Sequence, residues 1–139
     1  VSGATFTGAT FVNPSTKTSV SSAGLTGTPS TLPTDWFVAN GFLVGPGAFL
    51  SNRTGFDGLD LSNRNLRGVQ FAGDTLNNVN FAGSNLSGAS FKNAVLNNVN
   101  LDGANLASAN LSGASGTVSG TPTALPWGYK ISGGVLSPR

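Results

Sequence analysis

In groups of five, residues 56–111 read FDGLD LSNRN LRGVQ FAGDT LNNVN FAGSN LSGAS FKNAV LNNVN LDGAN LASAN L, and this stretch decides the fold. From Phe56 to Leu111 every fifth residue is Phe or Leu, in all twelve positions. A helix repeats its apolar residues about every 3.6 positions and a strand about every 2, so a strict period of five fits neither element. The chain must therefore turn between successive Phe or Leu residues.

Each five-residue repeat carries a second apolar position, two residues before the Phe or Leu. Side chains two apart lie on the same face of an extended segment, so both positions share one interior. The second position is usually small or branched, as in Leu59, Val69, Val79, Ala89, Ala94, Val99, Ala104 and Ala109. Gly and Asn are frequent after the Phe or Leu and tolerate the positive φ of sharp turns. Each repeat is therefore predicted to be a short extended piece followed by a corner.

A longer period of twenty residues contains the short one. Leu76-Asn77-Asn78-Val79-Asn80 recurs letter for letter as Leu96-Asn97-Asn98-Val99-Asn100. The simplest explanation is a stack with four repeats per turn, because stacked turns bury an apolar face that one repeat cannot bury alone. The expected interior column is Leu66, Leu86 and Leu106. The expected exterior column is an asparagine ladder of Asn65, Asn85 and Asn105.

The individual repeats follow a recognisable motif of a small residue, Asp or Asn, Leu or Phe, and two polar or glycine positions. Ala104-Asn105-Leu106-Ala107-Ser108 and Ala109-Asn110-Leu111-Ser112-Gly113 match it closely. Over residues 48–115 the chain resembles the pentapeptide-repeat family. The resemblance implies an all-β fold, a right-handed quadrilateral parallel β-helix (solenoid) of about three to four coils. The handedness follows from the resemblance alone, and the resemblance says little about function.

A second element occurs twice, on either side of the coil. Gly27-Thr28-Pro29-Ser30-Thr31-Leu32-Pro33 corresponds to Gly120-Thr121-Pro122-Thr123-Ala124-Leu125-Pro126, at an offset of 93 residues. Apolar runs follow each copy and surround Asn40-Gly41 in the first and Gly133-Gly134 in the second. Such pairs between apolar runs are strong signals for a β-hairpin. The sequence therefore predicts two flanking hairpins.

These patterns divide the chain into four parts. Residues 1–11 contain two motif copies, Ala4-Thr5-Phe6 and Ala9-Thr10-Phe11, and are predicted to end a preceding repeat block. The other parts are a loop with the first hairpin at 12–47, the β-helix at 48–115 and the second hairpin at 116–139. A chain that begins inside a repeat block is expected to come from a larger tandem-repeat protein.

Three positions break the period. One extra residue lies between Leu50 and Phe56, which predicts a bulge or a widened corner. Arg64 and Asp74 occupy the small inward position, where a charge buried alone is costly. Either the two charges pair, or the adjoining hairpin leaves this corner open to water, and we expect the open corner, with Arg64 extended outwards.

The composition leaves little chemistry available. The chain has no Cys and no His, so it lacks the usual general base, the common thiol nucleophile and the preferred ligands of zinc and copper. We predict no enzymatic activity, no catalytic residue, no cofactor and no metal site. Asp57 and Asp60, below Asn77 and Asn80, could form a weak calcium site. Calcium typically takes about six to eight oxygen ligands, so ordinary exposed repeat positions are the better interpretation.

Two groups of side chains could bind a ligand. The asparagine column could present a flat amide face to a carbohydrate or to ice, but a ladder that stabilises the stack is favoured. The aromatic residues of the hairpins could stack on sugars or bases, and these are Trp36, Phe37, Trp127 and Tyr129. Packing of the hairpins onto the coil is the favoured role of these aromatics.

Charge and hydropathy exclude two further classes. The net charge is +2, only 9% of residues are charged, and the basic residues are scattered, so nucleic-acid binding is not supported. No apolar stretch approaches the roughly 20 residues of a membrane span. The sequence leaves compartment and oligomeric state open, with an extracellular or cell-surface location slightly favoured over the cytoplasm.

The favoured function is a non-catalytic scaffold module that engages a protein partner through the rod surface or the hairpins. A surface-exposed carbohydrate-binding or ice-binding module is the first alternative. The second is a DNA mimic that interacts with gyrase, which the family resemblance brings in because some members have this role. Mimicry requires a strongly acidic rod. Residues 56–115 carry four Asp against two Arg and one Lys, a balance of −1, which disfavours it.

Overall fold

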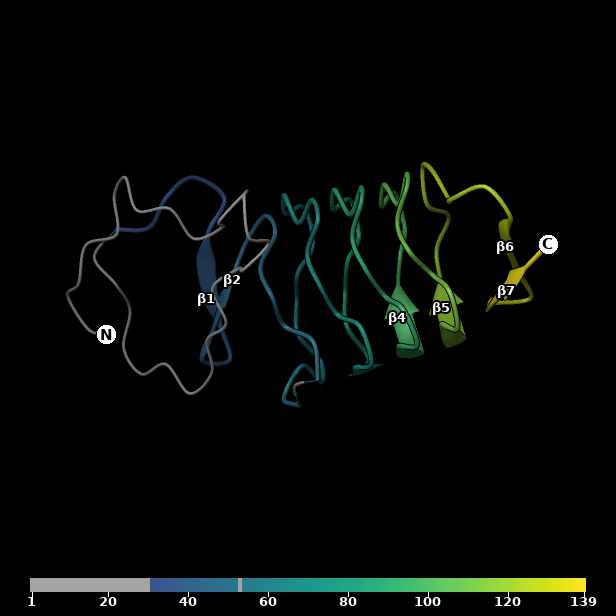
Figure 1. Cartoon of the computed structure of the whole chain (residues 1–139), viewed down its shortest axis with the longest axis horizontal. Coiled ribbons are helices and arrows are strands. Elements are labelled where there is room, and N and C mark those ends of the chain that lie inside the picture. The colour runs from purple at the N-terminus through teal and green to yellow at the C-terminus, as the bar shows by residue number, and fades with distance from the viewer. Residues whose placement is uncertain (1–30, 53) are drawn as a thin grey trace.

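The computed structural model describes residues 31–52 and 54–139, and this part of the chain is all-β, as the sequence predicted. Its strands are β1 (Phe37–Ala39), β2 (Phe42–Val44), β3 (Thr75–Asn77), β4 (Val95–Asn100), β5 (Ser115–Ser119), β6 (Tyr129–Ser132) and β7 (Val135–Pro138). β1 and β2 form a two-stranded sheet, and the other strands form a sheet in the order β3-β4-β5-β7-β6. Figure 1 shows a rod of stacked turns with the two hairpins at opposite ends.

Parallel pairing at a distance of twenty residues holds the turns together. β3 pairs with β4 in a register that places Leu76 opposite Leu96. Three further rows of parallel bridges run along the stack and include Asp60↔Asn80, Asn65↔Asn85 and Gln70↔Ser90. The four rows start five residues apart, so one turn of the stack takes four repeats. The predicted alignment of Leu76 with Leu96 is confirmed.

Most corners are tight turns closed by a backbone hydrogen bond. The Val69 N–H donates to the Leu66 carbonyl at 3.1 Å, and Gly68 between them has a φ of 72°. A positive φ at the third residue of a four-residue turn is the signature of a type II turn and favours Gly or Asn. The Leu66 N–H instead donates to the Asn85 carbonyl of the next turn at 2.9 Å. The five-residue repeat thus alternates one hydrogen bond within a corner with bonds between turns.

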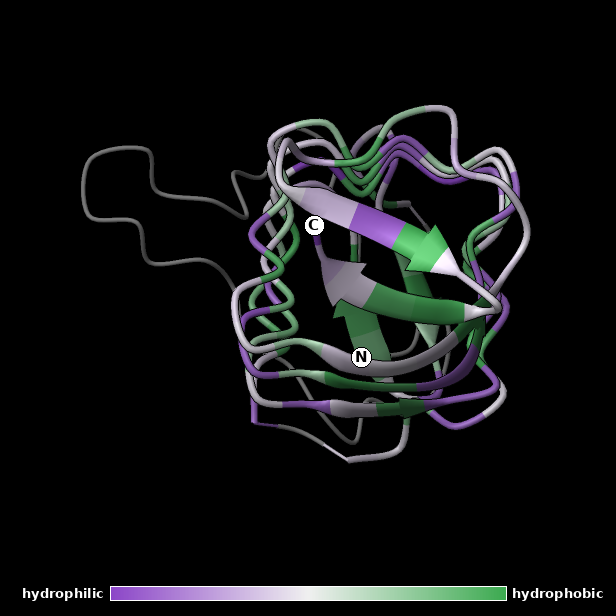
Figure 2. Ribbon diagram, turned by 90° about the vertical axis from the view of Figure 1, so that its right-hand side faces the viewer, coloured by the Kyte–Doolittle hydropathy of each residue, from purple (hydrophilic) through white to green (hydrophobic). Residues whose placement is uncertain are grey.

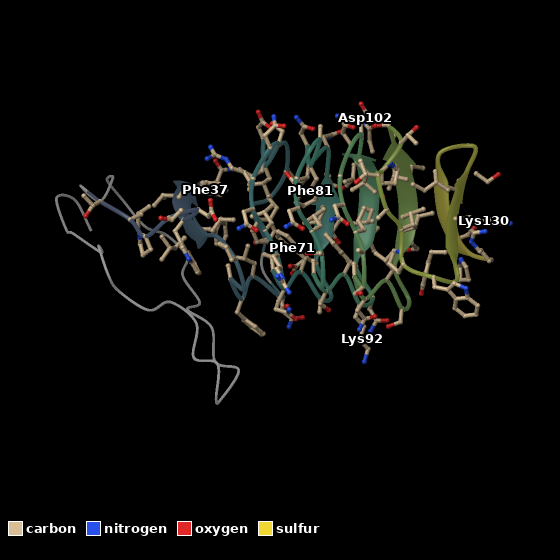
Figure 3. All side chains as sticks on the ribbon, turned by 90° about the horizontal axis from the view of Figure 1, so that it is seen from above. Phe37, Phe71, Phe81, Lys92, Asp102 and Lys130 are labelled. Carbon is tan, nitrogen blue, oxygen red and sulfur yellow. The ribbon has the colours of Figure 1, made fainter. Side chains whose placement is uncertain are left out.

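The Phe and Leu residues of the period fill the interior. The twelve Phe and Leu residues at every fifth position, from Phe56 to Leu111, are each at most 2% exposed. The Phe71 and Phe91 rings stack along the axis. Their centroids are 5.6 Å apart and their planes are nearly parallel. Phe71 and Phe81 lie inside the rod in Figure 3, whereas Lys92 and Asp102 project away from it. Burial of a Leu or Phe side chain contributes about 1.5–3 kcal/mol, so this column is the main source of stability.

The extra residue before Phe56 appears as a longer step in the stack. Phe49 pairs with Gln70, a distance of 21 residues instead of twenty. The bend that absorbs it contains Asn52 at a φ of 59° and Gly55 at a φ of 102°. A shallow hollow of about 320 Å³ opens beside this bend, lined by Asn52, Thr54, Gly55, Asp57, Gly73, Thr75 and Asn77. The predicted widening of this corner is confirmed.

The last turn extends further than the sequence pattern suggested. Parallel pairing continues past residue 115, through Val99↔Val118 in β5 to Asn105↔Ala124. The register shifts between Leu96 and Val99, so this turn is one residue shorter than the others. The predicted coil end at 115 followed the loss of Phe and Leu after Leu111. The backbone continues to pair without them because Val118 takes a buried inward place.

Both predicted hairpins are present. Asn40-Gly41 connects β1 to β2 and Gly133-Gly134 connects β6 to β7, and both residues of each pair have positive φ. This is the requirement of a type I′ hairpin turn. In Figure 2 the hairpin β6–β7 lies across the C-terminal end of the stack. Residues 1–30, which include the predicted repeat block at 1–11, lie outside the described residues, and the division into four parts stays a prediction.

Candidate functional site

Three columns of amide side chains connect successive turns on the outside of the rod. In the first, the Asn97 Nδ2 donates to the Asn77 Oδ1 at 2.8 Å, and the Asn77 Nδ2 donates to the Asp57 Oδ1 at 2.9 Å. The remaining bonds are Asn98 Nδ2 to Asn78 Oδ1, Asn100 Nδ2 to Asn80 Oδ1 and Asn80 Nδ2 to Asp60 Oδ1, at 2.8, 3.0 and 3.0 Å. Each bond links a turn to its neighbour, so the ladders stabilise the stacking.

The predicted column of Asn65, Asn85 and Asn105 is present as a row of parallel bridges, but its side chains do not form the predicted amide ladder. Among the described residues no hydrogen bond joins these three side chains to one another. Each Oδ1 instead accepts a backbone N–H two residues ahead, as from Ser87 to Asn85 at 3.1 Å and from Ala107 to Asn105 at 3.0 Å. This is an Asx turn, which competes with longer-range pairing for the amide oxygen. The sequence predicted the alignment of this column correctly but not the hydrogen bonds that its side chains form.

Asp57 and Asp60 lie where the sequence placed them, below Asn77 and Asn80, and each accepts one of those amides. Hydrogen bonds from Ser62, through its side chain and its backbone N–H, lower the pKa of Asp60 from its ordinary value of 3.8. The amide of Asn80 and the charge of Arg64 lower this pKa further. The described residues contain no group of three or more Asp, Glu, His or Cys side chains arranged to hold a metal ion.

Arg64 and Asp74 behave differently from each other. Arg64 is exposed, as predicted, and its guanidinium carbon lies 4.3 Å from the centroid of the Phe37 ring in β1. Asp74 is only 1% exposed, so the prediction of a corner open to water is wrong for this residue. Asp74 occupies the inward position that Ala94 occupies in the next turn. The next turn covers this position, and the Val95 N–H donates to the Asp74 carbonyl at 2.8 Å.

The sequence analysis missed a structural role for Ser84. This residue is 1% exposed and occupies an inward position that is usually Ala or Val. Its Oγ donates to the Leu61 carbonyl and accepts the Arg64 N–H at 3.2 Å. From the neighbouring turn, Ser84 therefore provides the hydrogen-bond partners of two backbone groups at the corner that contains Arg64. A Ser among small apolar residues in the inward column was the available signal.

The aromatic residues divide into packed and exposed. Trp36, Phe37 and Tyr129 are partly buried and pack against the core, which agrees with the favoured capping role. Trp127 is 100% exposed, so the prediction that it packs a hairpin onto the coil is wrong. The Tyr129 N–H donates to the Pro126 carbonyl at 3.2 Å, and this turn directs Trp127 into solvent.

Two hollows open on the surface of the described residues. The hollow beside Gly55 contains one carboxylate, Asp57, which is hydrogen-bonded to Asn77. The second hollow, of about 330 Å³ near the C-terminus, contains Lys130 and Arg139 but no carboxylate side chain. None of the described residues forms a helix long and apolar enough to cross a membrane.

A stack of parallel β-pairs with Phe or Leu at every fifth residue inside and amide ladders outside defines a repeat protein of the β class. The family model "Pentapeptide repeats" matches the chain in eight copies, over residues 56–93 and 76–113. A block of 58 residues, from 56 to 113, therefore consists of pentapeptide repeats, as the resemblance implied. No curated protein shows significant sequence similarity to it.

Proposed function

We propose that this chain is a non-catalytic scaffold module that presents a rigid, right-handed quadrilateral β-helix to a protein partner. One observation carries the proposal: the polar side chains that line the rod hydrogen-bond one another or the backbone of neighbouring turns, as Asn77 does with Asp57 and Asn97. Side chains committed to the stack make the rod stiff and leave few groups for chemistry. The family supports this role, since its members are generally structural repeats without enzymatic activity.

The module fits a larger tandem-repeat protein. The proposed parts are the end of a repeat block at 1–11, a loop and hairpin at 12–47, the β-helix at 48–115 and a second hairpin at 116–139. The duplication of the hairpin supports this division, because β1 and β2 align with β6 and β7 at the offset of 93 residues seen in the sequence. A β-helix between two hairpins is then the repeating unit.

The surface offers one flat face for a protein partner. The outward residues of β3, β4 and β5 include Thr75, Val95 and Ser115, which are exposed side by side on three successive turns. Val95 is among the exposed large apolar side chains. Parallel strands about 4.8 Å apart present such residues in a regular array, which suits a broad and shallow protein contact.

A surface-exposed ligand-binding module, for a carbohydrate or for ice, is the second candidate. Trp127 favours it, because a fully exposed indole can stack on a sugar ring. The amide ladders speak against it, since a side chain that already donates to its neighbour has less capacity to bind a ligand. The gyrase-interacting DNA mimic remains disfavoured by the charge balance of −1 over residues 56–115.

A glycan array and an ice-recrystallisation assay on the full chain test the scaffold proposal. We expect no specific glycan signal and no inhibition of ice growth. A glycan signal that disappears in Trp127→Ala but persists in Val95→Ala would replace the scaffold with a lectin-like module. Inhibition of gyrase supercoiling by the chain would support the DNA-mimic alternative instead.

A further inference from the structure

The second hairpin can be compared with the first, because the two align at an offset of 93 residues. Each begins with a tight turn: the Trp36 N–H donates to the Pro33 carbonyl at 3.1 Å, and the Tyr129 N–H donates to the Pro126 carbonyl at 3.2 Å. Both Trp36 and Tyr129 pack against the core. The first hairpin is therefore an internal reference for the side chains that this element needs in order to fold.

Three differences give the second hairpin an indole and two positive charges that the first lacks at these positions. They are Trp127 in place of Thr34, Lys130 in place of Phe37 and Arg139 in place of Pro46. All three side chains are exposed in the second hairpin. The turn closes with Thr34 as it does with Trp127, so the hairpin does not need the indole in order to fold.

The two positive charges line one hollow at the C-terminal end of the rod. It has a volume of about 330 Å³, and its walls include Thr121, Pro122, Leu125, Lys130, Ile131 and Arg139. No carboxylate side chain lines it. The neighbouring Asp102 is engaged elsewhere, since its Oδ1 accepts the Thr121 N–H at 3.0 Å. A hollow with two cations and no lining carboxylate side chain is complementary to a negatively charged group.

Arg139 is held in place by the turn that carries Trp127. Its backbone N–H donates to the Gly128 carbonyl at 2.8 Å, and its Nε donates to the Tyr129 carbonyl at 2.9 Å. A guanidinium has five N–H donors, and Nε uses one of them. Trp127 is the residue before Gly128, so an exposed indole and a positioned guanidinium belong to the same end of the hairpin.

The strand that lines this hollow has an open edge. β6 is the last strand in the order β3-β4-β5-β7-β6, as Figure 2 shows. Backbone groups that face a partner strand alternate with groups that face away from it. The Gly128 carbonyl accepts the Arg139 N–H, so Gly128 faces β7, and by alternation Tyr129 and Ile131 face away. Among the described residues no hydrogen bond is formed by these outward groups of Ile131, whereas Tyr129 bonds to Pro126 and Arg139.

The charges decide which strand suits this edge. An extended chain binds an open sheet edge through main-chain hydrogen bonds, and its side chains give the specificity. Cationic side chains at an edge repel a second copy of the same strand, which is a common protection against self-association. A segment with Asp or Glu at alternate positions instead places its carboxylates on one face, where Lys130 and Arg139 can bind them.

We propose that the C-terminal end of the rod binds an extended acidic segment of a partner protein. The segment pairs with the open edge of β6 at Ile131, its carboxylates contact Lys130 and Arg139, and the Trp127 indole packs on one of its apolar residues. Trp and Arg are among the residue types most enriched at the energetic centres of protein interfaces. The proposal rests on the scaffold function and adds where the partner binds and which charge it carries.

Calorimetric titration of the full chain with two peptides tests the role of charge. The probe is the acetylated and amidated octapeptide Glu-Val-Glu-Thr-Glu-Val-Glu-Thr, and its counterpart has Lys in place of Glu. We expect saturable binding of the Glu peptide alone, and a loss of about tenfold or more in K130E/R139E. The control R67E/K92E changes the net charge equally on the lateral surface, where Figure 3 shows Lys92, and should lose less than about threefold at physiological salt.

Backbone pairing at the edge has its own test. Ile131→Pro removes the outward N–H without removing a bond to β7, a position where a strand accepts proline. It should weaken binding of the Glu peptide by about fivefold, whereas Ile131→Val keeps the N–H and should bind as the wild type does. Hydrogen exchange of the Ile131 amide in the wild type requires no substitution, and the Glu peptide should slow it.

The indole is tested by the residue of the first hairpin. Trp127→Thr should keep the melting temperature of the wild type and weaken binding of the Glu peptide several-fold, because the first hairpin forms the same turn with Thr34. Unchanged affinity in this variant would remove Trp127 from the site and overturn the inference as stated.

Three other results would overturn the inference as a whole. They are no binding of the Glu peptide at millimolar concentration, an equal loss in R67E/K92E, and binding that leaves exchange of the Ile131 amide unchanged. Preference for a heparin fragment over the Glu peptide would also overturn it, since the hollow would then take a sulfated saccharide. The glycan array and the ice assay test the scaffold proposal by separate readouts, so either proposal can fail alone.

Discussion

The middle of the stack and its two ends keep their register in different ways. Between residues 60 and 110 the paired residues are twenty apart, as in Asn85↔Asn105 and Ser90↔Asn110. At the N-terminal end the distance is 21, in Phe49↔Gln70, and at the C-terminal end it is 19, in Asn105↔Ala124. The periodic sequence determines the register of the middle. At the ends, the register depends on individual glycines, on the shift between Leu96 and Val99 and on the hairpins.

The largest effect is expected from a cavity in the middle of the stack. Phe71 is fully buried and contacts the rings of Phe56, Phe81 and Phe91. Phe71→Ala should lower the free energy of unfolding by about 3–5 kcal/mol, since it removes apolar burial and leaves a void that neighbouring turns cannot close. Urea denaturation measures the change. A loss below about 1 kcal/mol would show that the column is not the principal core.

Alanine substitutions at two glycines, one near the C-terminal end and one in the middle, should differ in their effect on stability. A Cβ at Gly116 would lie 2.7 Å from the carbonyl carbon of Leu96, whereas a Cβ at Gly88 meets nothing within 4 Å. Both residues have positive φ, so Gly88→Ala should cost about 1 kcal/mol from backbone strain alone. Gly116→Ala should cost about 3 kcal/mol or more, because the backbone of β4 must also move. Thermal unfolding of the two variants gives the comparison, and equal losses would contradict it.

The amide ladders predict a smaller difference between two asparagines. Asn77 donates to Asp57 and accepts from Asn97, whereas Asn105 caps its own turn with one bond. Asn77→Ala should lower the free energy of unfolding by about 1–2 kcal/mol and Asn105→Ala by about 0.5–1 kcal/mol. The same chemical denaturation curves measure both. The ladders would be irrelevant to stability if the order were reversed.

The smallest effect is a dependence on pH at Asp60. Its pKa lies below the ordinary 3.8 in the folded protein, chiefly through the hydrogen bonds from Ser62. A lowered folded-state pKa means that the ionised carboxylate stabilises the fold above the unfolded pKa and that this contribution is lost as pH falls through the folded pKa. The difference in Tm between wild type and Asp60→Asn should therefore narrow as pH drops below about 4. A difference that widens on acidification would contradict the assignment.

Much of the middle could be predicted because its sequence repeats. The coincidence of Leu76-Asn77-Asn78-Val79-Asn80 with the same letters twenty residues later identified the row that pairs β3 with β4. Turn residues followed as directly, since Gly68 and Asn78 have the positive φ that their types allow. Periodicity reports on every turn at once, so a single misfit did not disturb the prediction.

The wrong predictions concern single side chains that can form more than one set of contacts, which a repeat pattern does not distinguish. Asn85 and Asn100 have the same side chain, yet only Asn100 donates to the turn before it. Asp74 is buried because the whole turn closes, although its charge alone argued for exposure. Parallel pairing also extends past residue 115, because backbone pairing does not need a Leu at each repeat. Such outcomes depend on three-dimensional neighbours that the sequence does not list in order.

Amide hydrogen exchange measured by NMR on the full chain tests the central claim most directly. The N–H groups of Leu66, Phe71, Phe81 and Leu86 each donate to a carbonyl one turn further along, at 2.7 to 2.9 Å. If twenty-residue turns stack into one rod, these amides should exchange slowly and at similar rates, because only opening of the stack exposes them. Fast exchange at these positions, or protection confined to the hairpins, would show that the turns do not stack as described.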